Sequence, residues 1–444
     1  MKLPTLLTIL LLTGGRSVAL EFPKPVENAK AGDLTTAKTN LQAGPATLGT
    51  LTVPENWDQP AKLIHLPVVV LHSPAEKSKE PIFIFHGGPG LSNLQTQHDY
   101  AWAREKHDVV LLGYRGVDGS VSLAMPEVNA LLKRISDPLS TAGLKELAAG
   151  LDGAAARLES TGVNCAAYNL DAVVADVEAA RKALGYQKIG VSGGSYGGAV
   201  ACYYCLSFPP AVERCALIEA AFPWTLGVTE PAEVDATLRR VSREWRTKPE
   251  NVARSEDILQ DLTGVLAALP REHNGVLIDP GTLRLITFMA LYTKPQTEMV
   301  LQAVVAAKRG DYTNLAQVDR LWPTVVDLFN WGDLCLKTFS SQAGPSRDFV
   351  AEMSPSDSII GSPLTLLGWG CRQFSSLRTK PLNHLQMQSI PVPTLLVYGS
   401  EEAAVSPRRQ LRFFPQGRLE VLGNLGHMDV WEQANRLQKA FFDQ

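Results

Sequence analysis

The sequence predicts an α/β protein, in which strands and helices alternate along one chain. Short continuous apolar runs, Pro81–Phe85 and Asp108–Gly113, are typical of strands that are covered on both faces. Apolar residues recur at helical spacing from Leu170 to Leu184, and another apolar run, Lys188–Val191, follows them. Because strand and helix alternate in this way, we expect a mostly parallel central sheet flanked by helices.

Further strand-like runs stand on both sides of this region. They are Leu48–Pro54, Leu63–His72, Cys215–Ala220, Pro393–Gly399 and Arg418–Gly423. Between residues 223 and 389 the pattern changes to amphipathic helices, such as Glu233–Trp245 and Met299–Lys308. The simplest account is one sheet domain interrupted by a large helical insertion, which we call the cap.

The domain organisation follows from these boundaries. We predict a signal peptide (1–19), a loosely ordered N-terminal lead-in (20–47), the first part of the sheet domain (48–222), the cap (223–389) and the second part of the sheet domain (390–444). A chain of 444 residues is long enough for such a sheet domain with its insertion.

Composition narrows the class of partner. Hydrophobic residues make up 45% of the chain and charged residues 20%, and the formal net charge is −3. This balance gives no reason to expect nucleic acid or an anionic membrane as a partner. No group of His and Cys residues has the spacing of a zinc site, so we expect neither a metal nor a cofactor.

The first residues are typical of a signal peptide. Lys2 supplies the positive charge, Leu6–Leu12 the apolar segment, and Ser17–Ala19 a small-residue cleavage site. The apolar segment is too short to span a bilayer comfortably. We therefore expect a secreted or periplasmic protein without stable membrane insertion, cleaved near Ala19.

Six cysteines fit an exported chain, because an oxidising compartment permits disulfides. They are Cys165, Cys202, Cys205, Cys215, Cys335 and Cys371. The sequence does not choose among their possible pairings. The pair at 202 and 205 lies in an apolar helical stretch, so we interpret it as packed core thiols or one structural bridge.

A serine stands among glycines directly after a predicted strand. The stretch Gly193–Gly197, "GGSYG", fits the pattern G-x-S-x-G between a strand and a helix. In such a nucleophile elbow the serine has a strained backbone, and neighbours without a Cβ let the strand and the helix approach it. We therefore predict that Ser195 is a catalytic nucleophile.

A serine hydroxyl needs a base, and the base needs an orienting acid. His427 in "GNLGHMDVW" follows the last predicted strand and precedes the closing helix, where the base stands in the order serine, acid, histidine. We predict that His427 is the base. The other histidines with a weaker claim are His86, His273 and His384.

The sequence leaves the acid open. After the late strand the chain reads "YGSEEAAVSP", and the expected spacing from its glycine ends on Glu402, with Glu401 beside it. An alignment on "VSP" would put Ala403 there instead. Glu219 ends an earlier strand and is a third candidate. We favour Glu402, with Glu401, Glu219 or no acid as the alternatives.

An oxyanion needs preorganised donors. The segment His86–Gly90, "HGGPG", supplies a glycine-rich loop after an early strand, and the amide of Tyr196 follows the predicted nucleophile. The presence of both segments at their expected places favours acyl-transfer chemistry over a simple tight turn.

Together, "HGGPG", "YRGVDGS", "GGSYGG" and the late "GH" resemble the proline iminopeptidase and tripeptidyl aminopeptidase branch of the α/β-hydrolase fold. The stretch "VPENWDQP" (Val53–Pro60) is similar to the N-terminal lead of the exported tripeptidyl members. The resemblance implies that Ser195 and His427 are catalytic and that the amides of Gly88 and Tyr196 hold the oxyanion. It also implies cleavage near a free amino terminus, often after proline.

This sequence departs from the family pattern at two positions. The family has Asp before the arginine in "DxRG", where this chain has Gly113, and it has Asp as the acid, where this chain has Glu402 at best. In the family, acidic cap residues grip the substrate amine. As groups that could grip this amine, the nearest carboxylates are better interpreted as solvated helix residues: Glu219, Glu230, Glu233 and Glu244.

Three functions remain in competition. The leading hypothesis is an exported serine aminopeptidase that acts on peptides. The second is an esterase or lipase for small esters, because ester and amide hydrolysis share the same machinery. The third is a binding protein that kept the fold and lost its acid. Epoxide hydrolases and dehalogenases are disfavoured because they need a carboxylate at the position of Ser195.

Overall fold

The computed structural model describes residues 20–444 except positions 99, 225, 227–228, 343–347, 354–356, 372–388 and 403–404. The predicted signal peptide therefore lies outside the described residues, as do His384 and Ala403. Within the described part of the chain, none of the helices combines the length and the apolarity that a membrane crossing requires.

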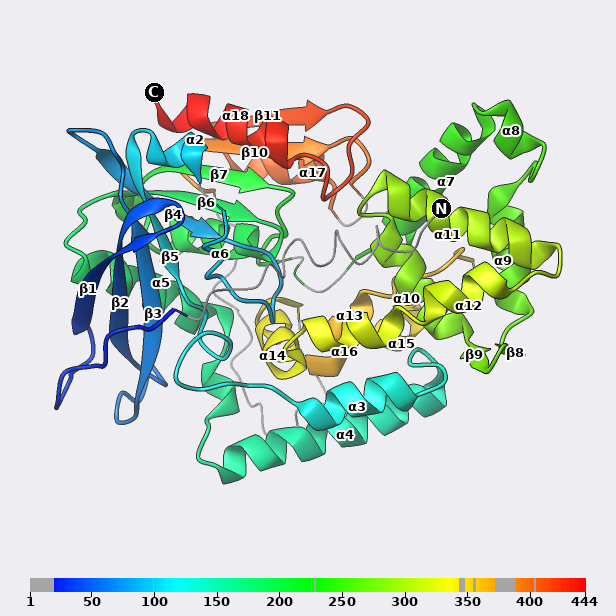
Figure 1. Cartoon of the computed structure of the whole chain (residues 1–444), viewed down its shortest axis with the longest axis horizontal. Helices are drawn as coiled ribbons and strands as arrows, with labels where there is room; N and C mark the ends of the chain where they lie inside the picture. Colours follow the sequence, from blue (N-terminus) through cyan, green and yellow to red (C-terminus); the bar gives the residue numbers. More distant parts are fainter. Residues whose placement is uncertain are drawn as a thin grey trace.

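Nine strands form one central sheet (Figure 1) in the order β1-β2-β3-β5-β4-β6-β7-β10-β11. Their bounds are β1 Leu34–Leu41, β2 Gly44–Pro54, β3 Leu63–Leu71, β4 Lys79–Phe85, β5 His107–Leu112, β6 Ile189–Gly194, β7 Val212–Ile218, β10 Thr394–Gly399 and β11 Gly417–Leu422. The pairs from β1 to β3 and β3 with β5 are antiparallel, and all remaining pairs are parallel. The prediction of a mostly parallel α/β sheet is confirmed.

Strand β1 lies in the segment that the sequence suggested was loosely ordered. It pairs with β2 over its whole length, from Leu34 opposite Leu51 to Leu41 opposite Gly44. All of its side chains are exposed or half-buried, and threonine is its commonest residue. A strand at the edge of a sheet needs no buried face. The alternation of apolar and polar residues that indicates a strand is therefore missing from β1.

Helices cover both faces of the sheet. Helices α5 (Leu170–Ala183) and α6 (Tyr196–Ser207) lie on one face, and α2 (Ala101–Arg104) and α18 (Trp431–Phe442) lie on the other. Helix α5 begins where the helical spacing begins, and the side chain of Asn169 caps it by accepting a hydrogen bond from the amide of Ala172. The α/β layering of the prediction is therefore present on both faces.

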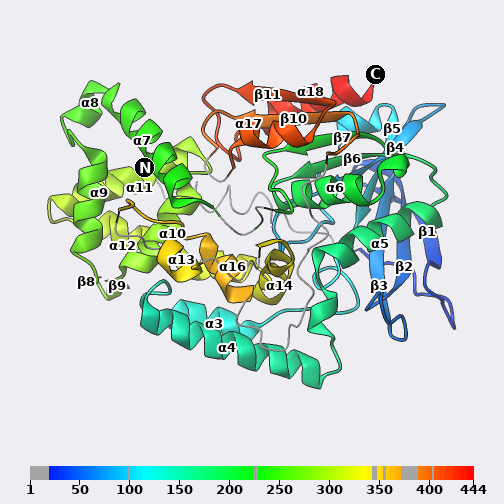
Figure 2. The same ribbon diagram turned by 180° about the vertical axis from the view of Figure 1, so that it is seen from behind.

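The cap contains helices α7 to α16, which gather beside the sheet domain (Figure 2). Their bounds are α7 Pro231–Arg246, α8 Pro249–Val252, α9 Ile258–Ala267, α10 Pro280–Ala290, α11 Lys294–Lys308, α12 Thr313–Asp319, α13 Trp322–Leu328, α14 Trp331–Gln342, α15 Phe349–Met353 and α16 Thr365–Cys371. A small hairpin of β8 (Arg271–His273) and β9 (Val276–Ile278), which the sequence did not suggest, interrupts them.

Two helices from the predicted first part of the sheet domain join the core of the cap. Helices α3 (Pro126–Arg134) and α4 (Thr141–Ser160) bury leucines in the same hydrophobic cluster as residues of the cap helices. Helix α4 is long and carries a buried apolar stripe. Such a stripe indicates that a helix is covered, but it does not say by which layer.

The carboxyl ends of the parallel strands meet at one edge of the sheet, which is where ligands bind in folds of this class. The loop after β4 carries His86–Gly90, and Ser195 follows β6 directly. Glu219 follows β7, Glu402 follows β10 and His427 follows β11. All the predicted site residues thus come from this edge.

Candidate active site

Ser195 occupies a strained turn between β6 and α6. Its φ is 51° and its ψ is −122°, a conformation that a residue with a Cβ rarely adopts. The turn is held by neighbouring backbone, because the amide of Ser195 donates to the carbonyl of Ile218 at 3.1 Å and its own carbonyl accepts from Ala221 at 2.9 Å. The half-buried serine therefore has the strained, fixed backbone of a nucleophile elbow.

The surrounding glycines allow a close approach of backbone to backbone. A Cβ on Gly193 would lie 2.2 Å from the carbonyl oxygen of Gly197, and a Cβ on Gly197 would lie 2.0 Å from the carbonyl oxygen of Phe85. Both distances are well inside van der Waals contact. The glycine cluster is thus required for β4, β6 and α6 to meet around Ser195.

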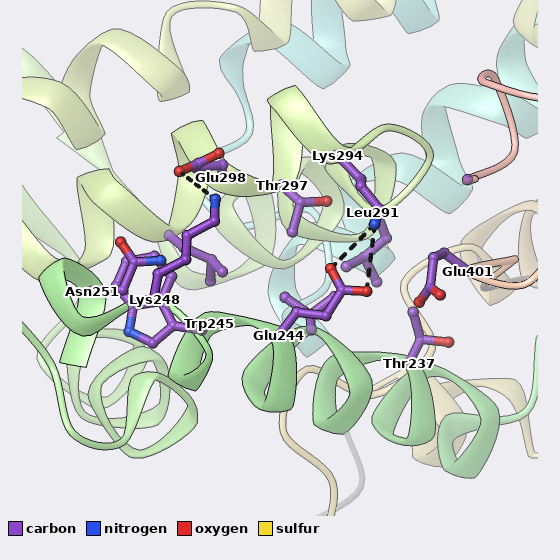
Figure 3. A pocket seen from close by; sticks show the side chains of 13 residues that line it. Thr237, Glu244, Trp245, Lys248, Asn251, Leu291, Lys294, Thr297, Glu298 and Glu401 are labelled. Carbon is purple, nitrogen blue, oxygen red and sulfur yellow. Dashed lines mark hydrogen bonds and ion pairs between the residues drawn. The ribbon is translucent and has the colours of Figure 1, made fainter. Parts of the chain in front are cut away.

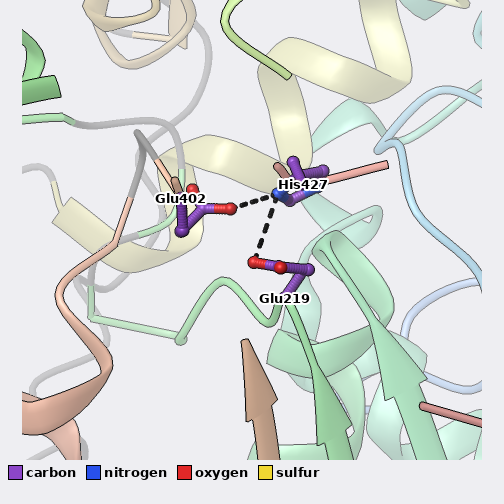
Figure 4. A group of neighbouring side chains, drawn as sticks. All are labelled: Glu219, Glu402 and His427. Atoms are coloured by element: carbon purple, nitrogen blue, oxygen red, sulfur yellow. Dashed lines mark hydrogen bonds and ion pairs between the residues drawn. The ribbon is translucent and has the colours of Figure 1, made fainter. Parts of the chain in front are cut away.

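His427 and Glu402 form a buried hydrogen-bonded pair (Figure 4). Nδ1 of His427 lies 2.6 Å from Oε2 of Glu402. The two residues are only 5% and 8% exposed. A carboxylate on Nδ1 fixes the proton on that nitrogen and leaves Nε2 as the basic atom. The pair therefore has the arrangement of a general base and its orienting acid.

Tyr292, just beyond the end of α10, was missed by the sequence analysis. Its ring stacks on the imidazole of His427, with centroids 4.5 Å apart and planes 24° from parallel. Its carbonyl also accepts a hydrogen bond from the amide of Met428 at 3.0 Å. The cap thereby holds the histidine loop, and an isolated tyrosine in a helical region gives no signal of this contact.

Glu401, one of the alternative acids, has other partners. Its carboxylate accepts from the hydroxyl of Ser400 at 2.7 Å and from Nε of Arg240 in α7 at 3.3 Å. The same arginine donates to the carbonyl oxygen of Glu402 at 3.2 Å. Arg240 thus draws one glutamate of the pair toward the cap, while its neighbour contacts the histidine.

Glu219, the other alternative, lies at the same site (Figure 4). Its Oε2 is 3.9 Å from Nδ1 of His427, too far for a hydrogen bond. Its Oε1 accepts a hydrogen bond from the amide of Gly399 at 2.5 Å. Burial, followed by the charge of Glu402, raises the pKa of Glu219 well above its usual range. Two of the three candidate acids therefore surround one imidazole.

These three side chains could also be considered as metal ligands. One ligand atom from each of Glu219, Glu402 and His427 lies within 4.8 Å of the others. However, Nδ1, the nitrogen that faces both carboxyls, is already engaged with Glu402 at hydrogen-bond distance. The geometry therefore fits a hydrogen-bonded histidine–carboxylate pair better than a metal site.

The loop after β4 lies against the predicted nucleophile. A Cβ on Gly87 would lie 3.0 Å from the Cβ of Ser195 and 3.4 Å from its Oγ. Gly88 follows with a φ of 141°, which favours glycine. Tyr196 is the first residue of α6, where the N–H groups have no acceptor within the helix. One predicted oxyanion donor, Gly88, therefore follows the glycine that lies against Ser195, and the other, Tyr196, follows Ser195 directly in the chain.

His86 has a structural role in this loop. Its Nε2 is 2.7 Å from the hydroxyl of Tyr100, and burial, reinforced by His98, lowers its pKa to about 3. A histidine that stays neutral over the ordinary pH range is a poor general base. His273 lies in strand β8 of the small hairpin in the cap, where its Nε2 contacts the hydroxyl of Thr313.

Helix α14 of the cap grips the same loop. The amide of Gly90 donates to Oδ2 of Asp333 at 3.1 Å, and its carbonyl accepts from the amide of Asn330 at 2.9 Å. Asp333 forms an ion pair of 2.6 Å with Lys337, and both side chains are fully buried. The sequence analysis missed this contact, because the aspartate and the loop are 243 residues apart.

A family model described as the alpha/beta hydrolase fold matches residues 80–249. The chain has the α/β-hydrolase fold. The matched region runs from β4 through Ser195 into the cap, and it ends before Glu402 and His427.

Solved structures with low sequence identity also resemble this chain. An esterase from Exiguobacterium antarcticum is 14% identical over 88% of this chain and 98% of that chain, with a TM-score of 0.39. A meta-cleavage product hydrolase from Pseudomonas fluorescens IP01 is 16% identical over 86% and 94%, with a TM-score of 0.39. A thermophilic esterase from Thermogutta terrifontis is 14% identical over 89% and 97%, with a TM-score of 0.38. No curated protein matches the chain, and likeness this low says nothing about activity.

The packing around Gly113 explains why this chain has glycine where the family that it resembles has Asp. A Cβ on Gly113 would lie 2.7 Å from the Cβ of Asp118 and 2.7 Å from Cγ of Pro67. The carboxylate of Asp118 accepts from the amides of Tyr114 and Asn93 at 2.8 and 3.0 Å. The space for a side chain at position 113 is therefore filled, and a nearby aspartate satisfies the local amides.

A cavity of about 210 Å³ lies between α7 and α11 of the cap (Figure 3). Two ion pairs stand in its wall, Glu244 with Lys294 at 3.3 Å and Lys248 with Glu298 at 3.5 Å. Its lining also includes two chain neighbours of the acid and the histidine, Glu401 and Gly426. The cavity thus borders the loops of the candidate site and is lined by both signs of charge.

Proposed function

We propose that the chain is a serine hydrolase in which Ser195 is the nucleophile, His427 the general base and Glu402 the orienting acid. The observation that carries this proposal is the 2.6 Å contact between Nδ1 of His427 and Glu402. The strained backbone of Ser195 at the same edge of the sheet supports it further. An intact acid also favours a catalyst over a binding protein with a lost triad.

The reaction follows the general course of acyl transfer. Oγ of Ser195 attacks the carbonyl carbon while Nε2 of His427 takes the hydroxyl proton. The amides of Gly88 and Tyr196 stabilise the oxyanion, and each donor of this kind is worth about 2.7–4 kcal/mol. The histidine then protonates the leaving group, which departs from an acyl-enzyme. A water molecule, deprotonated by His427, releases the acid and restores Ser195.

For the substrate class, we propose peptides that are cleaved near their amino terminus. Two features support this choice: the motifs around residues 86–90 and 193–198, and the charged cavity beside the candidate site. A lining with Glu–Lys pairs suits a ligand that carries its own charges better than an alkyl chain. A short acyl ester is the second candidate, because the same triad and oxyanion donors hydrolyse it.

The two substrate classes can be separated directly. We expect the mature protein to turn over an anilide of a free amino-terminal Pro or Ala, and to lose turnover when the amine is blocked. The control is the Ser195→Ala variant, which removes the nucleophile. Activity on a short acyl ester, with none on the anilide, would overturn the proposal that the substrate is a peptide and would support an esterase.

We also propose that the protein is exported, from the charged and apolar pattern of residues 2–19. The test is expression in the native host, fractionation, and amino-terminal sequencing of the recovered protein. A mature start near residue 20 in the exported fraction is expected. Recovery of the uncleaved chain from the cytoplasm alone would contradict export.

A further inference from the structure

The candidate site holds one carboxyl more than a triad uses. Glu402 contacts Nδ1 of His427 at 2.6 Å, whereas Oε2 of Glu219 stays 3.9 Å away. Glu219 is nevertheless almost completely buried, with 1% exposure. A buried carboxyl is expensive to keep unless it is paired, neutral or functional. Its surroundings indicate what it does.

Glu219 connects the ends of two strands. It follows β7 with a φ of 47°, and its amide donates to the carbonyl of Val397 in β10 at 2.9 Å. Its Oε1 accepts from the amide of Gly399, the last residue of β10, at 2.5 Å. The loop that carries Glu402 begins there. Glu219 therefore anchors the start of the acid loop while it occupies a strained conformation itself.

Burial and the charges around Glu219 together decide its protonation state. A carboxylate oxygen of Glu219 lies within 4.8 Å of the ligand atoms of Glu402 and His427. The other titratable groups that face it are Tyr398 of β10 and Asp429 of the loop before α18. Tyr292 of the cap also faces the pair.

His427 is engaged with Glu402, and none of the other neighbours can neutralise a second carboxylate. Asp429 repels it, and burial raises the pKa of both tyrosines, which therefore stay neutral. Arg240 contacts Glu401 and the carbonyl oxygen of Glu402, not Glu219. Two like charges at this separation in a buried site do not both persist. Glu402 is hydrogen-bonded to the imidazole, so the proton belongs on Glu219.

We propose that Glu219 is a positioning residue of the triad: a neutral carboxylic acid that anchors the acid loop through Gly399 and turns its proton toward Glu402. This inference rests on the proposed function. Its consequence is that Glu402 remains the single charged carboxylate at the histidine. The imidazolium formed during acyl transfer then meets one fixed negative charge rather than two.

The test compares Glu219→Gln with Glu219→Leu. Glutamine keeps an acceptor for the amide of Gly399 and a donor toward Glu402, so we expect kcat/KM within a few-fold of wild type and an unchanged pH profile. Leucine keeps the volume and removes both contacts. We expect it to lower kcat about 10²-fold with little change in KM, because the acid loop loses its position.

The matched variant of the proposed acid is Glu402→Gln, which should lower kcat about 10⁴-fold. A Glu219→Gln variant as damaged as Glu402→Gln would mean that Glu219 is the ionised acid, and would overturn the proposal. A Glu219→Leu variant that folds and keeps the wild-type kcat would overturn it as well.

A second readout does not depend on activity. A protonated Glu219 should give wild type an infrared carboxylic-acid band at neutral pH, which the difference spectrum between wild type and Glu219→Gln isolates because glutamine cannot give it. If that band is found but Ser195 is unreactive, the proposed function fails while the neutral Glu219 stands. If the band is missing from wild type, the proposal about Glu219 is wrong whatever the activity.

The stability of the protein provides a check on the same point. The pKa of Glu219 is raised above its ordinary 4.5, so the folded state binds its proton more tightly than the unfolded state. The free energy of unfolding of wild type should therefore fall relative to Glu219→Gln as the pH rises above 4.5. Parallel pH curves for the two proteins would contradict a neutral Glu219.

Discussion

Ser195 shows how a single residue depends on the atoms that its neighbours lack. Its φ of 51° is tolerable only because strand, helix and oxyanion loop meet around it without intervening side chains. The sequence could predict this residue, because glycines at fixed offsets after an apolar run leave a visible pattern. His427 could be predicted in the same way, from its place between the last strand and the last helix.

The glycine argument can be tested with Gly193→Ala. Its Cβ would lie 2.2 Å from the carbonyl oxygen of Gly197, so we expect a loss of about 1–3 kcal/mol in the free energy of unfolding and slower turnover. The control is Gly153→Ala in α4, where no atom lies within 4 Å of the new Cβ. Alanine is the better helix former, so this control should gain about 0.5–1 kcal/mol. Denaturant unfolding measures both, and a Gly193→Ala protein as stable and active as wild type would contradict the argument.

The carboxylate that contacts His427 could not be predicted to a single residue. The spacing after β10 leads to two adjacent glutamates, and a third ends β7. What separates Glu401 from Glu402 is Arg240 of α7, more than 160 residues earlier in the chain. A pairwise ion contact between distant elements leaves no local pattern in the sequence.

At the scale of the element, helix α10 connects the cap to the candidate site. Asp279 caps its first turn by accepting from the amide of Thr282 at 2.7 Å, and Tyr292, just beyond its end, stacks on His427. Burial, with the nearby charges of Asp137 and Asp319, raises the pKa of Asp279 to about 7. Asp279, the N-cap residue of α10, therefore titrates near neutral pH.

This shift predicts a pH dependence of stability. Between pH 3.8 and about 7 the folded state holds the proton of Asp279 more tightly than the unfolded state. The free energy of unfolding should thus fall as the pH rises through this window. Asp279→Asn keeps the N-cap hydrogen bond of α10 but cannot titrate. Its free energy of unfolding, relative to that of wild type, should therefore rise by at least about 1 kcal/mol from pH 4 to pH 8. Thermal unfolding at both pH values tests this, and an unchanged difference between the two proteins would contradict it.

At the scale of the whole molecule, the cap and the sheet domain meet through a buried ion pair. Asp333 and Lys337 of α14 pair with each other, and each bonds to backbone of the sheet domain, at Gly90 and Arg115. Removing one of the two charges leaves the other buried without its ion-pair partner. We expect Asp333→Asn to cost about 3–5 kcal/mol.

The double variant Asp333→Asn with Lys337→Met should recover much of that loss, because no unpaired charge remains and Asn can still accept from the amide of Gly90. Chemical unfolding of the two single variants and the double variant measures the coupling. Strictly additive losses would mean that the pair does not act as a unit across the interface between the cap and the sheet domain.

The alternation of strand and helix was sufficient to predict the layered fold from the sequence, because buried parallel strands are continuously apolar. Two features of the fold could not be predicted from this alternation. Strand β1 at the sheet edge has no buried face, and α3 and α4 have an apolar stripe that gives no hint of which layer it covers. Long-range packing decided both, and no local pattern encodes it.

The measurement that tests the triad most directly is the rate at which a fluorophosphonate labels Ser195, located by peptide mapping. We predict fast labelling of wild type and of Glu420→Gln, a control glutamate paired with Arg418 on β11. Glu402→Gln should label at least about 10²-fold more slowly, because the acid no longer orients the histidine. Equal rates in Glu402→Gln and wild type, or a loss found instead in Glu401→Gln, would contradict the account.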